Sequence, residues 1–191
     1  MHRCRLLATS ALALANAFAG FTSAQAAPLA ADGQWATFDV AFDLSGNLGW
    51  IDIADGSALS FTFSVSPGSV ATLTVVDGGF AGDRFQLSNN GAAFGSTSAA
   101  VNSYPANVYL DFDAALATAS YSRGGFTLGA GNHRIGGSLL ASAIDNTGAA
   151  LNSTVGGIRL TVTAVPEAAT AASLFAGLGL LAVALRRRAR T

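Results

Sequence analysis

Ser60-Phe61-Thr62-Phe63-Ser64-Val65 and Ala71-Thr72-Leu73-Thr74-Val75 are the two stretches that decide the fold of this 191-residue chain. In both, apolar side chains alternate with hydroxyl side chains. Successive side chains of a β-strand point to opposite faces, so this period of two places one face in a core and the other in water. Ser66-Pro67-Gly68 lies between them and is a turn sequence. The pair predicts two strands joined by a turn.

The same alternation recurs on both sides of this pair. It is found at residues 38–42, 84–88 and 158–163. Turn sequences separate these segments at a spacing typical of strands, at residues 77–79, 89–91, 129–131 and 146–148. The strongest hairpin signal is Asn90-Gly91, between Phe85-Gln86-Leu87 and Phe94.

Strands and turns without a long helical pattern predict an all-β fold. We expect an antiparallel two-layer β-sandwich of jelly-roll or immunoglobulin-like type, flanked by an N-terminal signal helix and a C-terminal transmembrane helix, with a closed barrel as the alternative. Residues 102–123 break the alternation and predict a long connection with one helical turn at 113–117. Long loops on rigid sandwiches are where binding sites usually lie. The alternation predicts buried Phe61, Phe63, Leu73, Val75, Phe85, Leu128, Leu160 and Val162, with Thr62, Thr72, Arg84 and Thr161 facing water.

The beginning of the chain has the pattern of a secretory signal peptide. Arg3 and Arg5 form a short basic region, an uncharged apolar run covers residues 6–21, and Ala24-Gln25-Ala26 has the form of an A-x-A cleavage site. A short transmembrane anchor is the alternative, which the alanine-rich run and the small residues after it disfavour. We predict a signal peptide at 1–26, recognised at Ala24 and Ala26. The single cysteine, Cys4, lies in this leader, so the mature domain has no disulfide.

The other end of the chain has the composition of a membrane span. Residues 168–185 are 18 residues without a charge, followed by Arg186, Arg187, Arg188 and Arg190. At 1.5 Å per helical residue this run spans about 27 Å, close to the thickness of a bilayer core. The alternative, a buried helix, would show polar positions along one face. Basic residues flanking a span stay in the cytoplasm, so we predict a cytoplasmic arginine anchor and an outward-facing segment 27–167.

The order of these C-terminal features resembles a known sorting signal. Val165-Pro166-Glu167 precedes the small-residue-rich apolar run and the terminal arginine cluster, and together they are similar to the PEP-CTERM signal of Gram-negative bacteria. Ala168 stands where that family usually has proline. The resemblance implies cleavage near the Pro-Glu motif by an integral-membrane exosortase, and association with bacteria that make exopolysaccharide. From the residues themselves, Pro166 biases Val165 to an extended conformation, or starts the helix at its first turn.

Between the two signals, residues 27–163 form the predicted β-domain, and 164–191 form the sorting signal. Ten Asp against four Arg give this domain a formal charge of −6. Nucleic acids and anionic membranes select basic faces, so the composition argues against nucleic acid as a partner. It suits an exported module that passes through the inner membrane and ends at the cell surface or outside the cell.

A second resemblance covers roughly residues 60–163. It rests on a series of short sequence motifs: Thr74-Val75-Val76-Asp77, Ala81-Gly82-Asp83-Arg84-Phe85, Asn90-Gly91, residues 94–98, residues 113–117 and residues 125–133. They are similar to a broad set of secreted bacterial and fungal proteins without assigned activity. The resemblance implies a shared β-rich extracellular module and identifies no ligand.

The residues needed for catalysis or metal binding are scarce. The predicted mature chain has one histidine, His133, and no G-x-S-x-G motif, which disfavours a hydrolase triad. One histidine and no cysteine disfavour zinc. Asp52 with Asp55, Asp77 with Asp83, and Asp111 with Asp113 are candidate carboxylate pairs for glycoside hydrolysis or calcium, but each lies beside turn residues, where Asp is favoured for its backbone hydrogen bonds. We predict no enzyme, no cofactor and no assigned metal site, and leave calcium binding at these pairs open.

Sugar binding would use exposed aromatic rings. The candidates are Trp35, Trp50, Tyr104, Tyr109 and Tyr121, and most aromatic residues of the chain occupy alternating core positions. Tyr104 and Tyr121 lie in the irregular region and are our predicted glycan contacts. The sequence therefore predicts a non-catalytic surface or extracellular-matrix protein associated with exopolysaccharide, with a carbohydrate-binding module as the alternative.

Overall fold

The structure is a computed structural model that describes residues 25–41, 48–106, 108–165, 173 and 186. The described part is mostly β-structure arranged in antiparallel sheets, which confirms the predicted all-β class. The leader up to Ala24 and nearly all of the predicted sorting signal lie outside the described residues. Among the described residues, no helix has the length and apolar composition to cross a bilayer.

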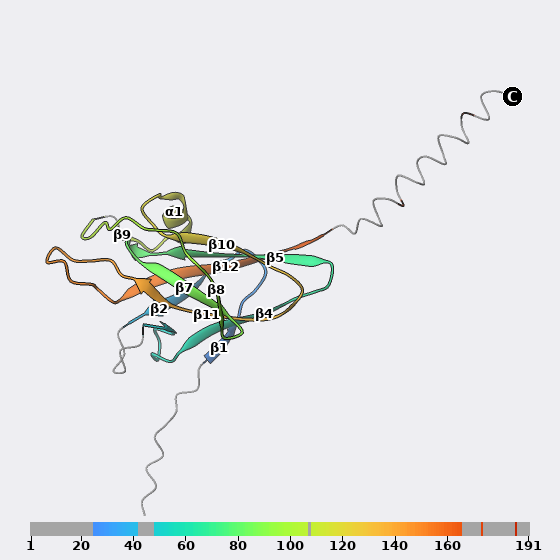
Figure 1. Cartoon of the computed structure of the whole chain (residues 1–191), viewed down its shortest axis with the longest axis horizontal. Helices are drawn as coiled ribbons and strands as arrows, with labels where there is room; N and C mark the ends of the chain where they lie inside the picture. Colours follow the sequence, from blue (N-terminus) through green and yellow to red (C-terminus); the bar gives the residue numbers. More distant parts are fainter. Residues whose placement is uncertain (1–24, 42–47, 107, 166–172, 174–185, 187–191) are drawn as a thin grey trace, which may run out of the picture.

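Two five-stranded sheets face each other (Figure 1). In sheet A the spatial order is β1 (Gln25–Pro28), β4 (Leu59–Val65), β11 (Gly131–Ala141), β7 (Arg84–Asn89) and β8 (Ala92–Ser96). In sheet B it is β10 (Arg123–Leu128), β5 (Ser69–Asp77), β12 (Thr154–Ala164), β2 (Ala36–Val40) and β3 (Trp50–Ile51). The short strands β6 (Gly79–Phe80) and β9 (Val108–Tyr109) pair with each other.

The strand pairs are antiparallel with one exception. β1 runs parallel to β4, with Ala26 opposite Ser60. The predicted cleavage after Ala26 would remove the first two residues of β1 and leave Ala27 and Pro28 in place. The predicted hairpin is confirmed, because β7 and β8 are joined at Asn90 and Gly91, whose φ angles of 51° and 84° are left-handed.

Both sheets contribute to one main core. Its buried members are Leu29, Phe38, Val40, Trp50, Leu59, Phe61, Val65, Ala71, Leu73, Val75, Phe85, Leu87, Leu128, Ile135, Ile158 and Leu160. Six of the eight predicted core residues are buried, and Phe63 and Val162 are half-buried against the same core. Thr72 and Thr161 are exposed as predicted, whereas Thr62 and Arg84 are half-buried. Arg84 is covered because its Nη2 donates to the carbonyl of Thr97 at 3.4 Å.

A second, smaller cluster lies on the other side of sheet B, beneath α1 (Phe112–Ala117). We call it the α1 cluster; its buried members are Val76, Ala81, Phe112, Ala115 and Tyr121. α1 is the predicted helical turn, and it begins at Asp111, whose side chain accepts hydrogen bonds from the backbone N–H groups of Asp113 and Ala114. The helix approaches closely because Gly157 has no side chain: a Cβ there would lie 2.6 Å from Cγ of Phe112.

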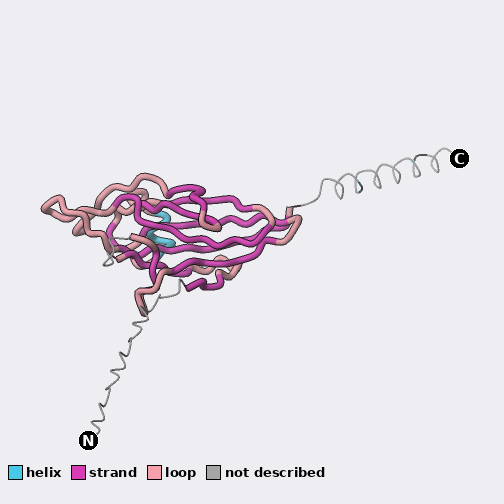
Figure 2. The backbone as a smooth tube through the Cα atoms, turned by 60° about the horizontal axis from the view of Figure 1, so that its bottom comes forward, coloured by secondary structure: helices cyan, strands magenta, loops and turns pink. Residues whose placement is uncertain are grey.

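The strand register defines two ends of the sandwich. Ala164 lies opposite Ser69, Leu128 opposite Ala71 and Gly131 opposite Val65, so β12 ends beside the β4–β5 and β10–β11 turns. We call this the C-terminal end; the chain leaves the domain there (Figure 2). The loop between β11 and β12 and the turn at residues 52–57 are at the opposite, distal end (Figure 1).

Candidate functional site

Tyr121 is not a glycan contact in this structure, which corrects our prediction. Its side chain has no exposed surface. The hydroxyl donates to the carbonyl of Gly79 at 2.6 Å and accepts from the backbone N–H of Tyr109 at 3.2 Å. The irregular sequence around Tyr121 therefore reflects the packing of the α1 cluster, where the buried tyrosine hydroxyl forms hydrogen bonds with both β6 and β9.

Tyr104 is half-buried, and its ring packs edge-on against Phe80 with 4.8 Å between the ring centres. Of the other aromatic candidates, Trp50 is buried in the main core, and Trp35 is half-buried under the guanidinium of Arg159. These rings lie on different parts of the surface and core. Tyr104 and Tyr121 both contact β6, at Phe80 and Gly79, but the buried Tyr121 presents no surface to a ligand.

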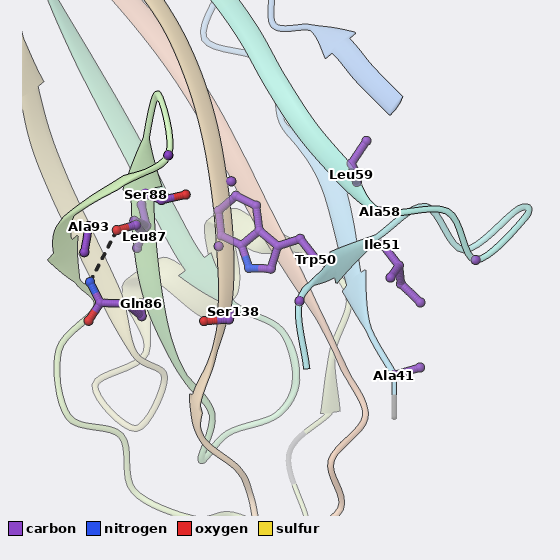
Figure 3. Close-up of a pocket in the computed structure, with 15 residues that line it drawn as sticks. Ala41, Trp50, Ile51, Ala58, Leu59, Gln86, Leu87, Ser88, Ala93 and Ser138 are labelled. Atoms are coloured by element: carbon purple, nitrogen blue, oxygen red, sulfur yellow. Dashed lines mark hydrogen bonds between the residues drawn. The ribbon is translucent and has the colours of Figure 1, made fainter. Parts of the chain in front are cut away.

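A groove of about 740 Å³ lies on sheet A where β4 separates from β11 (Figure 3). The ladder between β11 and β4 ends at Ile135 opposite Phe61, and the next contact along β11 is Ser138 with Gly49. Gly136 and Gly137 lie between these contacts and form part of the lining. The other lining residues are Ala41, Gly49, Trp50, Ile51, Gly56, Ala58, Leu59, Gln86, Leu87, Ser88, Gly91, Ala93 and Ser138.

A second hollow of about 520 Å³ continues this groove, sharing Ser88, Gly91 and Gly136 with it. Ser60, Asn90 and Arg134 complete its lining, and Nε of Arg134 donates to Oγ of Ser60 at 2.9 Å. We call the two together the β11 groove. The volume of each hollow lies in the range of small-ligand sites, about 300–1,000 Å³.

The β11 groove is lined by glycines and other small residues, by apolar side chains such as Trp50 and Leu59, and by polar groups. Of the described residues that line it, none is an acid, although the domain is acidic, and Arg134 is the one that carries a charge. The two neighbouring glycines differ: a Cβ on Gly137 would lie 2.4 Å from Cε2 of Trp50, whereas a Cβ on Gly136 would lie 3.4 Å from Oγ of Ser88. Our sequence reasoning missed this groove, because its only signal was Gly136-Gly137 inside a strand, which marks a close approach.

At the distal end, Asp77 and Asp83 form a buried pair of carboxyl groups. Asp77 Oδ2 accepts from the backbone N–H groups of Gly82 and Asp83 at 3.3 and 3.2 Å. Asp83 Oδ1 accepts from the N–H of Ala143 at 2.9 Å. The other oxygen of Asp77, Oδ1, is buried without a hydrogen-bond partner. The pair joins the end of β5 to the start of β7 and to the β11–β12 loop.

Burial dominates the electrostatics of this pair. Loss of solvent, together with the neighbouring Asp83 carboxylate, raises the pKa of Asp77 to about 9, against three backbone hydrogen bonds that lower it. Burial also raises the pKa of Asp83, while the N–H of Ala143 and the hydroxyls of Thr154 and Ser142 lower it. Asp77 is therefore a neutral acid near pH 7, which avoids the cost of a buried charge.

The other two acidic pairs have the backbone roles that turn chemistry predicts. Asp52 and Asp55 each accept from a backbone N–H two residues later, and hydrogen bonds from Ser57 lower the pKa of Asp55. Asp111 begins α1, and Asp113 forms an ion pair with Arg159 at 2.9 Å. Within the described residues, no group of three acidic, histidine or cysteine side chains could hold a metal ion.

His133 is held by amide groups. Its Nδ1 lies 3.0 Å from Nδ2 of Asn89, and its Nε2 lies 3.0 Å from the carbonyl of Gly129. An amide nitrogen only donates and a carbonyl only accepts, so in this arrangement Nδ1 accepts from Asn89 and Nε2 donates to Gly129. In the described part of the chain, this ring contacts no hydroxyl or carboxylate that would make it a catalytic base.

Of the predicted sorting motif, Val165 alone lies in the described residues. It follows β12 directly, is exposed, and donates its backbone N–H to the carbonyl of Gly68 at 2.7 Å. Pro166, Glu167 and three of the four arginines of the predicted anchor, Arg187, Arg188 and Arg190, lie outside the described residues. In the sequence, Pro166 therefore directly follows the last described residue after β12.

Comparisons of this chain with protein-family models, with curated proteins and with solved structures found no match.

Proposed function

We propose that this chain is a non-catalytic exported protein of the cell surface or extracellular matrix, sorted by a C-terminal signal of the exosortase type and associated with exopolysaccharide. The leader 1–26 directs export across the inner membrane. The helix at 168–185 then holds the chain there, with Arg186, Arg187, Arg188 and Arg190 in the cytoplasm and the domain outside. An exosortase-type enzyme releases it near Val165-Pro166-Glu167. No cofactor, metal or nucleic acid takes part.

The end of β12 carries this proposal. β12 ends at Ala164 and is followed by Val165, so in the sequence the Pro-Glu motif comes directly after this strand and precedes the apolar run. A signal placed between a finished domain and a membrane span leaves the domain intact when the span is removed. We further propose that the two sheets form a sandwich of immunoglobulin-like or jelly-roll type, a scaffold whose loops and faces can bind partners without changing the core.

Fractionation of cells tests the sorting proposal. In a Gram-negative host with an active exosortase, the wild-type chain should leave the membrane fraction, while Pro166→Ala with Glu167→Ala should remain there and resist extraction at alkaline pH. The control is Asn146→Ala in the distal loop, which should behave as wild type. Identical distributions of wild type and the double variant would contradict the assignment of the motif.

The β11 groove supports a second candidate function, a carbohydrate-binding module. Sugar hydroxyls are bound by hydroxyl, amide and guanidinium groups, which Ser88, Ser138, Asn90 and Arg134 provide along the groove. Glycines in its lining would let a ring approach the backbone closely. The exposed aromatic stacking partner that we expected at Tyr121 is absent, so binding would depend on these polar groups.

Affinity electrophoresis in gels that contain exopolysaccharide tests this candidate. Gly136→Leu should fill the groove and abolish retardation, because a side chain at Gly136 extends over the groove without meeting the main core. The matched control is Gly125→Leu on β10 in sheet B, where an added Cβ would have no neighbouring atom within 4 Å. Equal retardation of the two variants would exclude the groove as the sugar site.

A further inference from the structure

The C-terminal end of the sandwich is formed by two uncharged, exposed turns. Ser66-Pro67-Gly68 joins β4 to β5, and Gly129-Ala130-Gly131 leads from β10 into β11. Val165 lies beside the first turn and exposes about half of its side chain. Uncharged residues of these two turns therefore lie at the end where the chain leaves the domain.

The acids of the domain are concentrated away from this end. Of the nine described aspartates, Asp32 alone lies near it, opposite Thr161 in the strand register. The others belong to the middle of the domain or to the distal end. For example, Asp39 and Asp77 pair with the first residues of β12, and Asp145 lies in the β11–β12 loop. A domain with this excess of acid thus has one end that would not be repelled by an anionic surface.

The connection between this end and the apolar run is very short. Val165 is fixed by its hydrogen bond to Gly68, and the uncharged run begins at Ala168, three residues later. A fully extended chain spans at most about 3.6 Å per residue, so the two points are no more than about 11 Å apart. The headgroup layer on one side of a bilayer is about 5–8 Å thick. With the run in the bilayer, the C-terminal end therefore reaches the headgroups.

We propose that the turns at 66–68 and 129–131 form a lipid-contacting surface that rests on the headgroups of the membrane while the chain is anchored. This inference rests on the proposed function, because it requires residues 168–185 to span the membrane. It adds an orientation of the domain: the strands run roughly along the bilayer normal, and the distal end with its acids points away from the bilayer. Carboxylates at the C-terminal end would be repelled by anionic lipid and lose hydration there, and the two turns carry none.

Depth-dependent fluorescence quenching tests this orientation in the full chain. In a Cys4→Ser background, a fluorophore is attached at Ala130→Cys or at Asn146→Cys, and the chain is inserted into phosphatidylethanolamine–phosphatidylglycerol vesicles that carry headgroup spin labels. Both positions are exposed; residue 130 lies in the β10–β11 turn at the C-terminal end, and residue 146 lies in the β11–β12 loop at the distal end. The label at residue 130 should be quenched severalfold more strongly than the label at residue 146. Equal quenching in inserted protein would overturn the proposed contact.

A charge variant separates lipid contact from simple proximity. Ser66→Asp places an acid on the contacting turn, and Asn146→Asp places one at the distal end. In vesicles with anionic lipid, Ser66→Asp should reduce the quenching at residue 130 and Asn146→Asp should not; an equal effect of both would contradict the contact. Resistance to alkaline extraction is measured on the same samples and reports whether the chain has inserted. A chain that fails to insert overturns the proposed function as well as this inference. An inserted chain without the quenching difference overturns only this inference.

Discussion

The main core and the α1 cluster are both buried, but they are built differently. The main core is filled by side chains from regular strands of two facing sheets. The α1 cluster combines a turn, a short helix and an irregular connection, and it depends on a close approach at Gly157 and on the hydroxyl of Tyr121. The buried carboxyl of Asp77 follows directly after Val76 of this cluster. The main core should therefore respond mainly to lost volume, and the α1 cluster to lost polar contacts, added atoms and pH.

The largest expected effect is a loss of stability with rising pH. The pKa of Asp77 is raised to about 9 in the folded domain, and the unfolded value is about 4. The folded state therefore binds more protons between these values, so this contribution is fully present below about pH 4 and is lost as the pH rises towards 9. Urea denaturation across this range should show decreasing stability. Asp77→Asn should flatten the pH profile of stability, whereas the control Thr72→Ala, which removes no titratable group, should keep its slope. A wild-type profile that rises with pH would contradict the buried neutral acid.

Truncation in the main core should have the next largest effect. Phe85→Ala removes a fully buried ring that contacts Phe38 and Trp50, and should cost about 3–5 kcal/mol. Thr72→Ala, on the exposed face of β5, should change stability by about 0.5 kcal/mol or less. Chemical denaturation of both variants measures the difference, and equal costs would refute the assignment of inward and outward faces.

A smaller effect is expected from one added methyl group in the α1 cluster. Gly157→Ala brings a Cβ to within 2.6 Å of the Phe112 ring, so the helix must shift, at a cost of about 1–3 kcal/mol. Gly125→Ala on β10 adds the same group with nothing within 4 Å, and should be nearly neutral. Thermal unfolding of the pair gives the comparison. If Gly157→Ala were as stable as Gly125→Ala, α1 would not be packed on sheet B as described.

The smallest expected effect comes from a single oxygen atom. Tyr121→Phe keeps the ring but leaves the carbonyl of Gly79 and the N–H of Tyr109 without their partner, which should cost about 1–2 kcal/mol. Hydrogen exchange should show faster opening at Tyr109 and little change at Leu73 in the main core. Uniform acceleration at both sites would mean that the two clusters unfold as one unit.

The regular strands were predictable because their burial follows a period of two. Phe61, Leu73 and Leu160 are buried for that reason, and Asn90-Gly91 marked its hairpin because both residues accept a left-handed backbone. Tyr121 was misassigned because its irregular surroundings resembled an exposed loop, whereas hydrogen bonds to distant backbone bury it. The pairing of Asp77 with Asp83 was visible from their spacing, but their burial was not. That burial, and the separation of β4 from β11 that opens the groove, depend on tertiary contacts that have no local pattern.

The intact mass of the protein isolated from native cells with an active processing enzyme is the most direct test of the central claim. An exported and sorted protein should begin at Ala27 and end near Pro166-Glu167, with the folded domain up to Val165 complete. A stable product that still carries Arg186, Arg187, Arg188 and Arg190 would contradict processing at the C-terminal signal. A product that also retains the leader would contradict export.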